Sequence, residues 1–222
     1  MSSAQRPARL ILASASPARL RTLRAAGIEP DVLVSGVDEA TVTETEPGRL
    51  SLRLAELKAE TVARQVVPGP LVLGCDSVLD FDGEIYGKPT DPADAVARWK
   101  RMRGRTGTLH TGHCLIDTAT GRGTTAVADT LVRFAEITDA EIAAYVATGE
   151  PLAVAGGFTI DGLGGPFVEG VDGNPGTVIG LSLPTLRGLL ARFGISITEL
   201  WSSPVPASVA LEDPALAHEE AG

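Results

Sequence analysis

The sequence predicts a protein of the α/β class, because strand patterns and helix patterns follow one another along the chain. Short apolar runs typical of buried strands begin at Leu10 and fill residues 71–79. Residues 47–65 carry apolar side chains at three- and four-residue spacing, which predicts an amphipathic helix. Residues 106–117 and 124–134 flank a Thr-Gly turn and are expected to form an antiparallel pair. With 222 residues, the chain is long enough to bury a substantial core.

Composition and charge limit the partners that this chain is expected to bind. A net charge of −9 argues against long nucleic acid, which requires a broad basic surface. No apolar run is long enough to span a bilayer and residues 1–9 lack the apolar core of a signal peptide, so we expect no membrane partner. Cys75 and Cys114 have no metal-ligand spacing and are interpreted as small buried residues of a reduced, cytoplasmic protein. The sequence leaves open whether the protein forms a homodimer.

The first predicted strand leads into a helix through a turn of small residues. Ser16 suits the N-cap position and Pro17 the first helical position. The unpaired N–H groups and the dipole at a helix start bind anions, phosphate above all. The hydroxyls of Ser14 and Ser16 and the guanidinium of Arg19 would lie beside such an anion. An ordinary capped turn followed by a basic helix face explains the same pattern.

Three carboxylates follow or interrupt predicted strands. Asp38 and Glu39 are adjacent and lie just past the strand expected at residues 31–37. Neighbouring oxygen ligands of this kind suit a divalent metal, and a solvated loop is an equally good interpretation. Asp76 lies inside an otherwise apolar strand, where an unpaired buried carboxylate would be costly. We therefore expect Asp76 to face a partner, a metal or a cavity.

Lysine is scarce in this chain, which makes each one a candidate for a specific role. Of the 19 basic residues, only Lys58, Lys88 and Lys100 are lysines. Lys58 is predicted at the edge of the apolar stripe of its helix, from which it extends to water or over a cleft. Gly87 and Pro89 are expected to hold Lys88 in a stiff, extended loop. The compact ammonium of lysine is suited to contact a phosphate.

The remaining polar motifs are weaker candidates for a site. His110 and His113 would point to opposite faces of one strand, so a single metal ion could hardly bind both. Residues 155–165 are rich in glycine but lack the spacing of a dinucleotide-binding loop. Residues 1–200 are expected to form a single domain. Residues 201–222, rich in Pro, Ala and Glu, are predicted to be a disordered tail.

Seven segments of the chain occur in a distinctive order and spacing. They are Ser14 to Arg19, Asp38-Glu39, Lys58, Gly74 to Ser77, Gly87 to Pro89, Tyr145 to Pro151 and Gly162 to Gly164. In this order they resemble the Maf family of nucleoside triphosphate pyrophosphatases. The resemblance extends from about Leu10 to Phe193 and rests on all the segments jointly.

The resemblance implies a fold, a reaction and a set of site residues. The fold would be similar to that of inosine-triphosphate pyrophosphatases, with a long mixed sheet, flanking helices and a cleft between two lobes. The reaction would be hydrolysis of ordinary or modified nucleoside triphosphates to the monophosphate and pyrophosphate. By resemblance, Asp76 activates water beside a Mg²⁺ or Mn²⁺ ion held by Asp38, Glu39 and Asp76 itself. The expected substrate-binding residues are Ser14, Ser16, Arg19, Lys58, Ser77, Lys88 and Asp161.

Three positions depart from the best-described subgroup of this family, which acts on dTTP and UTP. Ala18 stands where that subgroup has arginine, Ser77 where it has threonine, and Asp161 where it has glutamine. These positions bear on the choice of base, so that specificity is not carried over to this chain. Two other functions remain to be compared: a non-catalytic nucleotide-binding regulator of septation, and a metal-dependent phosphatase that releases orthophosphate.

Overall fold

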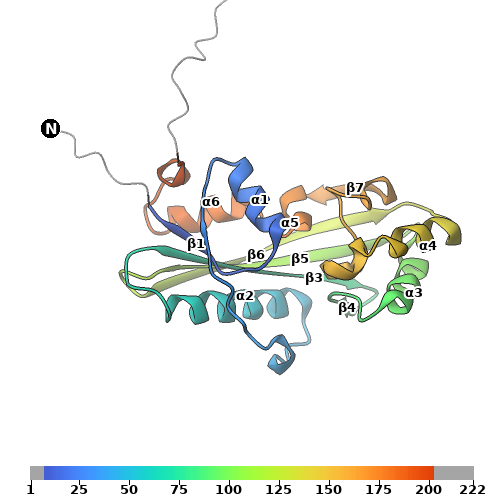
Figure 1. Ribbon diagram of the computed structural model, residues 1–222, viewed down its shortest axis with the longest axis horizontal. Helices are drawn as coiled ribbons and strands as arrows, with labels where there is room; N and C mark the ends of the chain where they lie inside the picture. Colours follow the sequence, from blue (N-terminus) through green and yellow to red (C-terminus); the bar gives the residue numbers. More distant parts are fainter. Residues whose placement is uncertain (1–7, 203–222) are drawn as a thin grey trace, which may run out of the picture.

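The computed structural model describes residues 8–202, in which helices cover both faces of one sheet (Figure 1). The strands are β1 (Leu10–Leu12), β2 (Asp31–Val32), β3 (Leu71–Phe81), β4 (Glu84–Tyr86), β5 (Thr106–Asp117), β6 (Arg122–Phe134) and β7 (Val168–Gly173). The α-helices are α1 (Pro17–Ala25), α2 (Pro47–Ala63), α3 (Pro92–Met102), α4 (Asp139–Ala147), α5 (Pro175–Ile179) and α6 (Leu183–Ala191). Short 3₁₀ turns are η1 (Glu39–Thr41), η2 (Glu150–Ala153), η3 (Ala155–Gly157), η4 (Gly165–Phe167) and η5 (Ile197–Leu200). Among these residues, no helix has the length and apolar character needed to cross a membrane.

The sheet is mixed, as expected for the predicted class. Its order is β2-β1-β3-β5-β6-β7, and β4 pairs with the far end of β3. β1 runs parallel to β2 and β3, whereas every other pairing is antiparallel. The expected hairpin forms β5 and β6, and its strands pair from Thr106↔Arg133 to Asp117↔Arg122. The predicted α/β fold with a long mixed sheet is confirmed.

One edge of β3 has a gap in its pairing. β1 pairs with Leu71 to Leu73, and β4 pairs with Leu79 to Phe81. Between them, residues 74–78 pair with β5 on the other side of the strand, and no described strand lies along their free edge. The carbonyl oxygen of Leu73 accepts from Ala13 N (2.8 Å), and backbone groups two residues apart point to the same edge of a strand. The backbone of Cys75 and Ser77 therefore faces this gap, next to Asp76.

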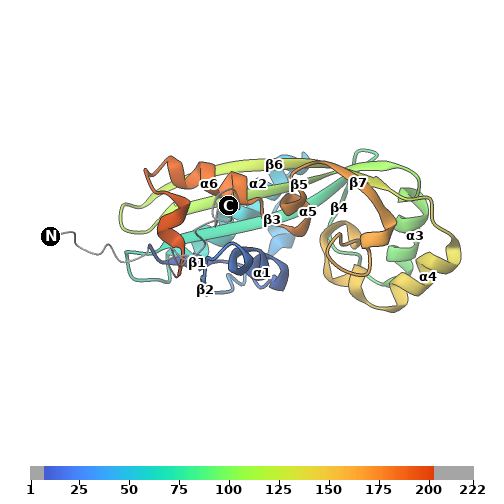
Figure 2. The same cartoon turned by 90° about the horizontal axis from the view of Figure 1, so that it is seen from above.

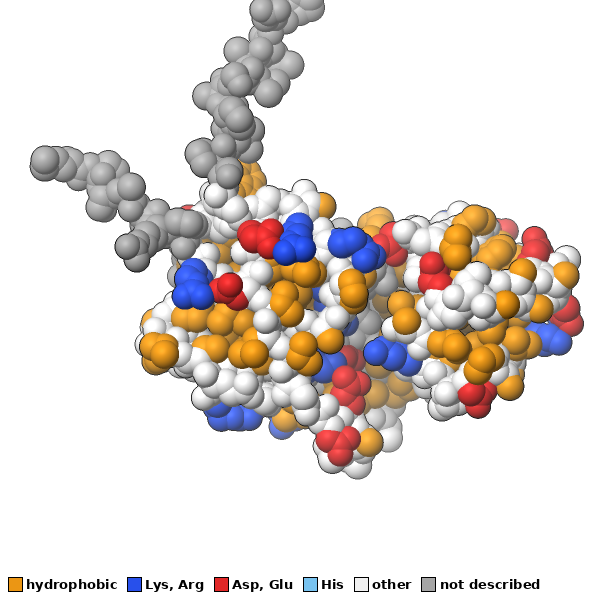
Figure 3. Space-filling model, in the orientation of Figure 1, with side chains coloured by type: hydrophobic (Ala, Val, Ile, Leu, Met, Phe, Trp, Pro, Cys, Tyr) orange, Lys and Arg blue, Asp and Glu red, His pale blue; other side chains and the backbone are white. Residues whose placement is uncertain are grey.

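Two lobes share the long strands β3, β5 and β6, which run the length of the molecule (Figure 2). The first lobe has aliphatic cores on both sheet faces, around Leu23 and Leu73 under α1 and α6, and around Ala55 and Ala59 under α2. The second lobe contains β4, α3 and α4, and its core is built around Trp99. Figure 3 shows a hollow between the lobes, where basic and acidic side chains meet. The cleft lies beside the gap in β3.

Helix α2 packs closely on the sheet because two strand positions lack a side chain. A Cβ atom at Gly74 would come within 2.2 Å of the carbonyl oxygen of Ala55, and one at Gly112 within 2.3 Å of that of Ser51. Both distances are far below van der Waals contact, so only glycine allows this helix position. The close approach brings Lys58 of α2 over β3.

Some predicted boundaries were wrong, and the pairing explains why. The strand expected at residues 31–37 is limited to Asp31–Val32, because its partner β1 ends at Leu12 and Gly36 has a positive φ of 64°. The helix expected to reach residue 65 ends at Ala63. Most of the predicted tail lies outside the described residues, while Trp201 at its start forms a β-bridge with Ile28.

Candidate active site

The turn after β1 has the predicted strand-to-helix geometry. Ser16 caps α1, since its hydroxyl accepts a hydrogen bond from Arg19 N (3.4 Å), and Pro17 is the first helical residue. The hydroxyl of Ser14 accepts from Ser16 N (3.2 Å), which folds the turn back on itself. Ser14 and the N-terminus of α1 therefore lie at the end of the β3 gap that is next to β1.

Arg19 is buried and held in one orientation by three hydrogen bonds. Its Nε donates to the carbonyl of Gly180 (2.8 Å), and its two terminal nitrogens donate to the hydroxyls of Ser14 (3.0 Å) and Ser77 (3.2 Å). A guanidinium has five N–H donors, so these bonds leave two donors for a further acceptor. The structure thus brings together three of the predicted substrate-binding residues, Ser14, Arg19 and Ser77.

Lys58 lies between two carboxylates. Its Nζ atom is 2.5 Å from Oδ1 of Asp76 and 2.7 Å from Oε1 of Glu39. The Lys58 and Asp76 side chains are each only 11% exposed, whereas Glu39 is 56% exposed on the η1 turn. The partner that the sequence analysis required for Asp76 is therefore Lys58, which is buried and does not extend to water.

The environment of Asp76 favours its protonated form more than water does. Burial raises the pKa of Asp76 above the usual value of a carboxyl, and the positive charges of Lys58 and Arg19 oppose this shift. A carboxylate with a raised pKa is a better proton acceptor near neutral pH. Asp76 is thus a carboxylate of raised basicity, and it lies beside the gap in β3.

The expected three-carboxylate metal site is not assembled as such. Within residues 8–202, no three side chains among His, Cys, Asp and Glu are grouped as a metal site. Asp38 caps η1, where its carboxylate accepts from Ala40 N (3.1 Å). Glu39 and Asp76 face one common cation, the Lys58 ammonium. Two carboxylates around one positive charge fit Mg²⁺ or Mn²⁺, which is commonly held by one or two carboxylates and the substrate phosphates.

Lys88 lies on a loop that is fixed on both sides of it. The carbonyl of Gly87 accepts from Gly156 N (3.1 Å) and from the guanidinium of Arg98 (2.9 Å). Pro89 packs beside Gly157. The lysine itself is exposed, and it comes two residues after the last β4 pair, Tyr86↔Leu79. Lys88 therefore follows the strand that bounds the gap at the end opposite β1.

Asp161 belongs to the second lobe and contacts the first. Its carboxylate is 3.4 Å from the guanidinium of Arg21 on α1. The loop that carries it is held by Glu150, whose carboxylate accepts from Thr159 Oγ1 (2.6 Å) and Gly164 N (3.0 Å), among others. Burial acts to raise the pKa of Glu150, but these hydrogen bonds hold it below its usual value. A rigid loop therefore presents Asp161 at the mouth of the cleft.

Sequence reasoning missed the roles of two buried polar residues of β5, which bond to Ser77 and to the start of α6. The Thr111 hydroxyl bonds to that of Ser77 (2.9 Å) and donates to the carbonyl of Thr177 (2.8 Å). His113 is fully buried, and its Nε2 accepts from Ser182 N (3.0 Å). The sequence signal that could have identified them is that Thr111 and His113 are polar residues two positions apart in an apolar strand. His110 pairs with Asp129 on β6 at 2.7 Å, so the two histidines share no site.

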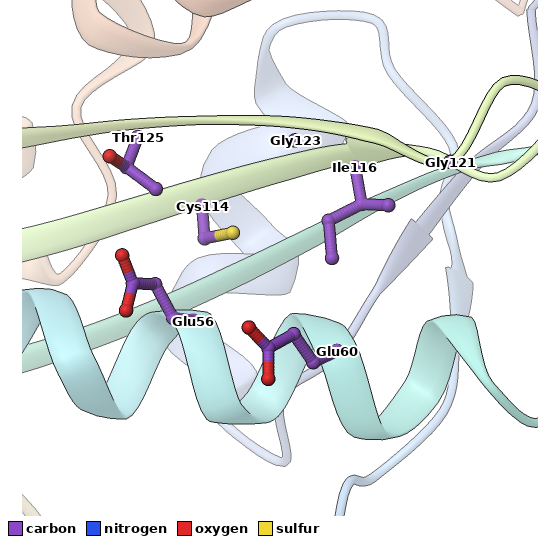
Figure 4. Close-up of a pocket in the computed structure, with 7 residues that line it drawn as sticks. All are labelled: Glu56, Glu60, Cys114, Ile116, Gly121, Gly123 and Thr125. Carbon is purple, nitrogen blue, oxygen red and sulfur yellow. The ribbon is translucent and has the colours of Figure 1, made fainter.

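A second hollow lies between α2 and the β5–β6 hairpin (Figure 4). It has a volume of about 350 Å³, and its lining includes Glu56, Glu60 and Cys114. Burial raises the pKa of the Cys114 thiol to about 12, so this cysteine is the protonated, apolar residue that the sequence predicted. Among the described residues, two carboxylates and no cation line the hollow, which would repel a phosphate. The candidate active site is the cleft.

Fold and site together define an α/β protein with an anion-binding strand-to-helix turn and a buried carboxylate–lysine pair in a cleft. Residues 9–193 match the family model described as Maf-like protein. The chain belongs to the Maf family. The resemblance stated from the sequence motifs is confirmed.

Two relatives of high sequence identity agree with this family assignment. The chain is 61% identical over 217 residues to a nucleoside triphosphate pyrophosphatase of Salinispora tropica, covering 94% of this chain and 96% of that protein. It is 64% identical over 195 residues to a protein of the same name from Streptomyces coelicolor, covering 87% and 95%. A solved dITP/XTP pyrophosphatase of Mycobacterium abscessus aligns with a TM-score of 0.41 and 14% identity, covering 83% and 94% of the two chains.

Proposed function

We propose that this protein is a nucleoside triphosphate pyrophosphatase, which cleaves its substrate between the α- and β-phosphates. The observation that carries the proposal is the buried Asp76–Lys58 pair, which lies beside an open strand edge and an anion-binding turn. The Salinispora tropica and Streptomyces coelicolor relatives bear the name of this activity. A purely regulatory nucleotide-binding protein would have no need of a buried proton acceptor.

The triphosphate is proposed to lie along the gap in β3. Ser14, Ser16 and the start of α1 would bind phosphate oxygens at one end, and Lys88 would bind them at the other. Arg19 would donate its two remaining N–H groups to the same oxygens. Catalysis by this arrangement consists mainly of positioning and charge neutralisation.

Asp76 is proposed to accept a proton from the attacking water. The water oxygen forms a new bond to the α-phosphorus. The bond between the α-phosphorus and the oxygen that bridges it to the β-phosphate breaks, and pyrophosphate leaves with the electrons of that bond. The raised pKa of Asp76 suits it to this transfer, and before substrate binds the charge of Lys58 opposes the rise.

A divalent cation is part of the proposal, and Glu39 and Asp76 are the residues that would hold it. Such an ion, when bound, neutralises charge that develops on the phosphates. Asp38 was also predicted as a metal ligand. Its carboxylate caps η1, so its role as a ligand stays a prediction. The free, buried thiols of Cys75 and Cys114 support a reducing compartment, and we propose the cytoplasm.

Asp161 is proposed to contribute to the choice of base. An ionised carboxylate only accepts hydrogen bonds, so it favours a base edge that presents an N–H donor, as guanine, uracil and thymine do. In adenine the amino group lies beside a ring nitrogen that is an acceptor and would face the carboxylate unfavourably. Asp161 forms an ion pair with Arg21 of the first lobe. ATP is therefore expected to be a poor substrate.

The test is a panel of ordinary and modified nucleoside triphosphates with Mg²⁺ or Mn²⁺, assayed for pyrophosphate. Wild type is expected to release pyrophosphate, and Asp76→Asn to lower kcat by about 100-fold or more, because it removes the base and keeps the shape. Circular dichroism confirms that the variant is folded.

Other products would identify the competing functions. Release of orthophosphate instead of pyrophosphate would indicate a phosphatase. Nucleotide binding without any turnover would indicate the regulator. Near-wild-type turnover in folded Asp76→Asn would remove this residue from the mechanism.

A further inference from the structure

The ammonium of Lys58 occupies the position that the proposed function assigns to a divalent cation. Its Nζ atom contacts Oε1 of Glu39 at 2.7 Å and Oδ1 of Asp76 at 2.5 Å. These are the same two carboxylates that fit a metal. One pair of carboxylates thus has two alternative cationic partners.

The two partners exclude one another for electrostatic reasons. A divalent ion that touched both carboxylates would lie within a few ångströms of the ammonium, in a site where Lys58 and Asp76 are almost fully buried. Like charges repel strongly at this range when water is excluded. Binding of the ion therefore requires Lys58 to leave the carboxylates.

Arg19 and Lys58 are both buried basic residues of the cleft, and of these two Lys58 is the one that can change partners. Arg19 is fixed by three hydrogen bonds from Nε and both terminal nitrogens. Lys58 has a flexible four-carbon stem, and the ion pairs with Glu39 and Asp76 are its described contacts. A triphosphate in the gap would offer new acceptors for its ammonium.

We propose that Lys58 is an internal counter-ion that keeps divalent cations out of the site until a triphosphate arrives. The ammonium then transfers from Glu39 and Asp76 to a phosphate oxygen, and both carboxylates become available at that moment. Metal and nucleotide enter together, and metal does not bind first. The inference rests on the proposed function and adds an order of binding to it.

The test measures Mn²⁺ binding without nucleotide at pH 8, by electron paramagnetic resonance of the free ion. Lys58→Gln is expected to bind Mn²⁺ at least tenfold more tightly than wild type. Lys58→Arg keeps the positive charge and should bind as weakly as wild type, as should Lys100→Gln, which loses only a surface ion pair. Adding Glu39→Gln to Lys58→Gln should abolish the gain and so locate the ion. If Lys58→Gln is unfolded by circular dichroism, Lys58→Met takes its place.

Two results would overturn the inference: equal Mn²⁺ affinity in wild type and Lys58→Gln, or an equal gain in Lys58→Arg. Pyrophosphate release by wild type is measured in parallel. A gain in Mn²⁺ affinity without any wild-type turnover would refute the proposed function and leave the counter-ion role. Turnover without the gain would refute the counter-ion role alone.

Discussion

Replacing Gly74 with alanine should damage both stability and activity, because this glycine sets the distance between α2 and β3. The new Cβ would lie 2.2 Å from Ala55 O and 2.8 Å from Ala59 N, both backbone atoms of α2. Ordinary contact begins near 3.4 Å, so the helix must move away by about 1 Å. Overpacking of this kind costs about 1–3 kcal/mol.

The same displacement should reach the candidate site. Lys58 lies between Ala55 and Ala59 in sequence and moves with them, which lengthens its 2.5 Å contact with Asp76. Misplacement of a catalytic group by about 1 Å can cost about 100-fold in rate. We therefore expect Gly74→Ala to lower kcat by up to this factor.

Urea unfolding and pyrophosphate release measure the two effects. Gly188→Ala is the matched control, because a Cβ there meets no described atom within 4 Å inside α6. This control should raise the free energy of unfolding by about 0.5–1 kcal/mol and leave kcat unchanged. Wild-type stability and turnover in Gly74→Ala would refute the close-packing argument.

Three further predictions follow from other parts of the cleft and the core. Lys88→Ala should lower kcat/KM by about 10- to 100-fold, since it removes a charged hydrogen bond to phosphate, and Lys100→Ala should be nearly silent; equal effects would contradict the assignment. Asp161→Gln should change the rank order of bases in the nucleotide panel more than the best rate, and an unchanged order would end the base-reading role. Burial lowers the pKa of His113 to about 4, so the unfolded chain binds more protons between that pH and the usual value of about 6.5. Stability should therefore fall by about 2 kcal/mol from pH 7 to pH 5 through this residue, and urea unfolding of His113→Gln should show a smaller decrease; equal decreases would contradict the assignment.

The sequence by itself determined the elements whose signals are local. Ser16 and Pro17 start α1, and Thr138 with Glu141, three residues apart in the sequence, forms a capping box at the start of α4. The Thr-Gly turn joins β5 to β6 where it was expected. These features follow from hydrogen bonds and backbone preferences within a few residues, which a sequence pattern records directly.

The sequence also identified most of the charged cluster, but not how its members are connected. Asp76 was singled out because a carboxylate is costly inside an apolar strand, and that argument required a partner without naming it. The partner, Lys58, is 18 residues away on α2 and was expected only near the edge of the apolar face of that helix. Arg21, the partner of Asp161 across the lobes, could not be inferred from spacing.

Only the tertiary structure decided where the cleft lies and what faces it. The gap in β3 exists because β1 ends its pairing at Leu73 and β4 begins at Leu79, which depends on strand order and register. Arg19 is oriented by the carbonyl of Gly180, 161 residues away, and no local pattern encodes such a contact. Local signals fix helices and turns because they act between neighbours in the chain. Site geometry depends on pairings that form when distant segments pack together.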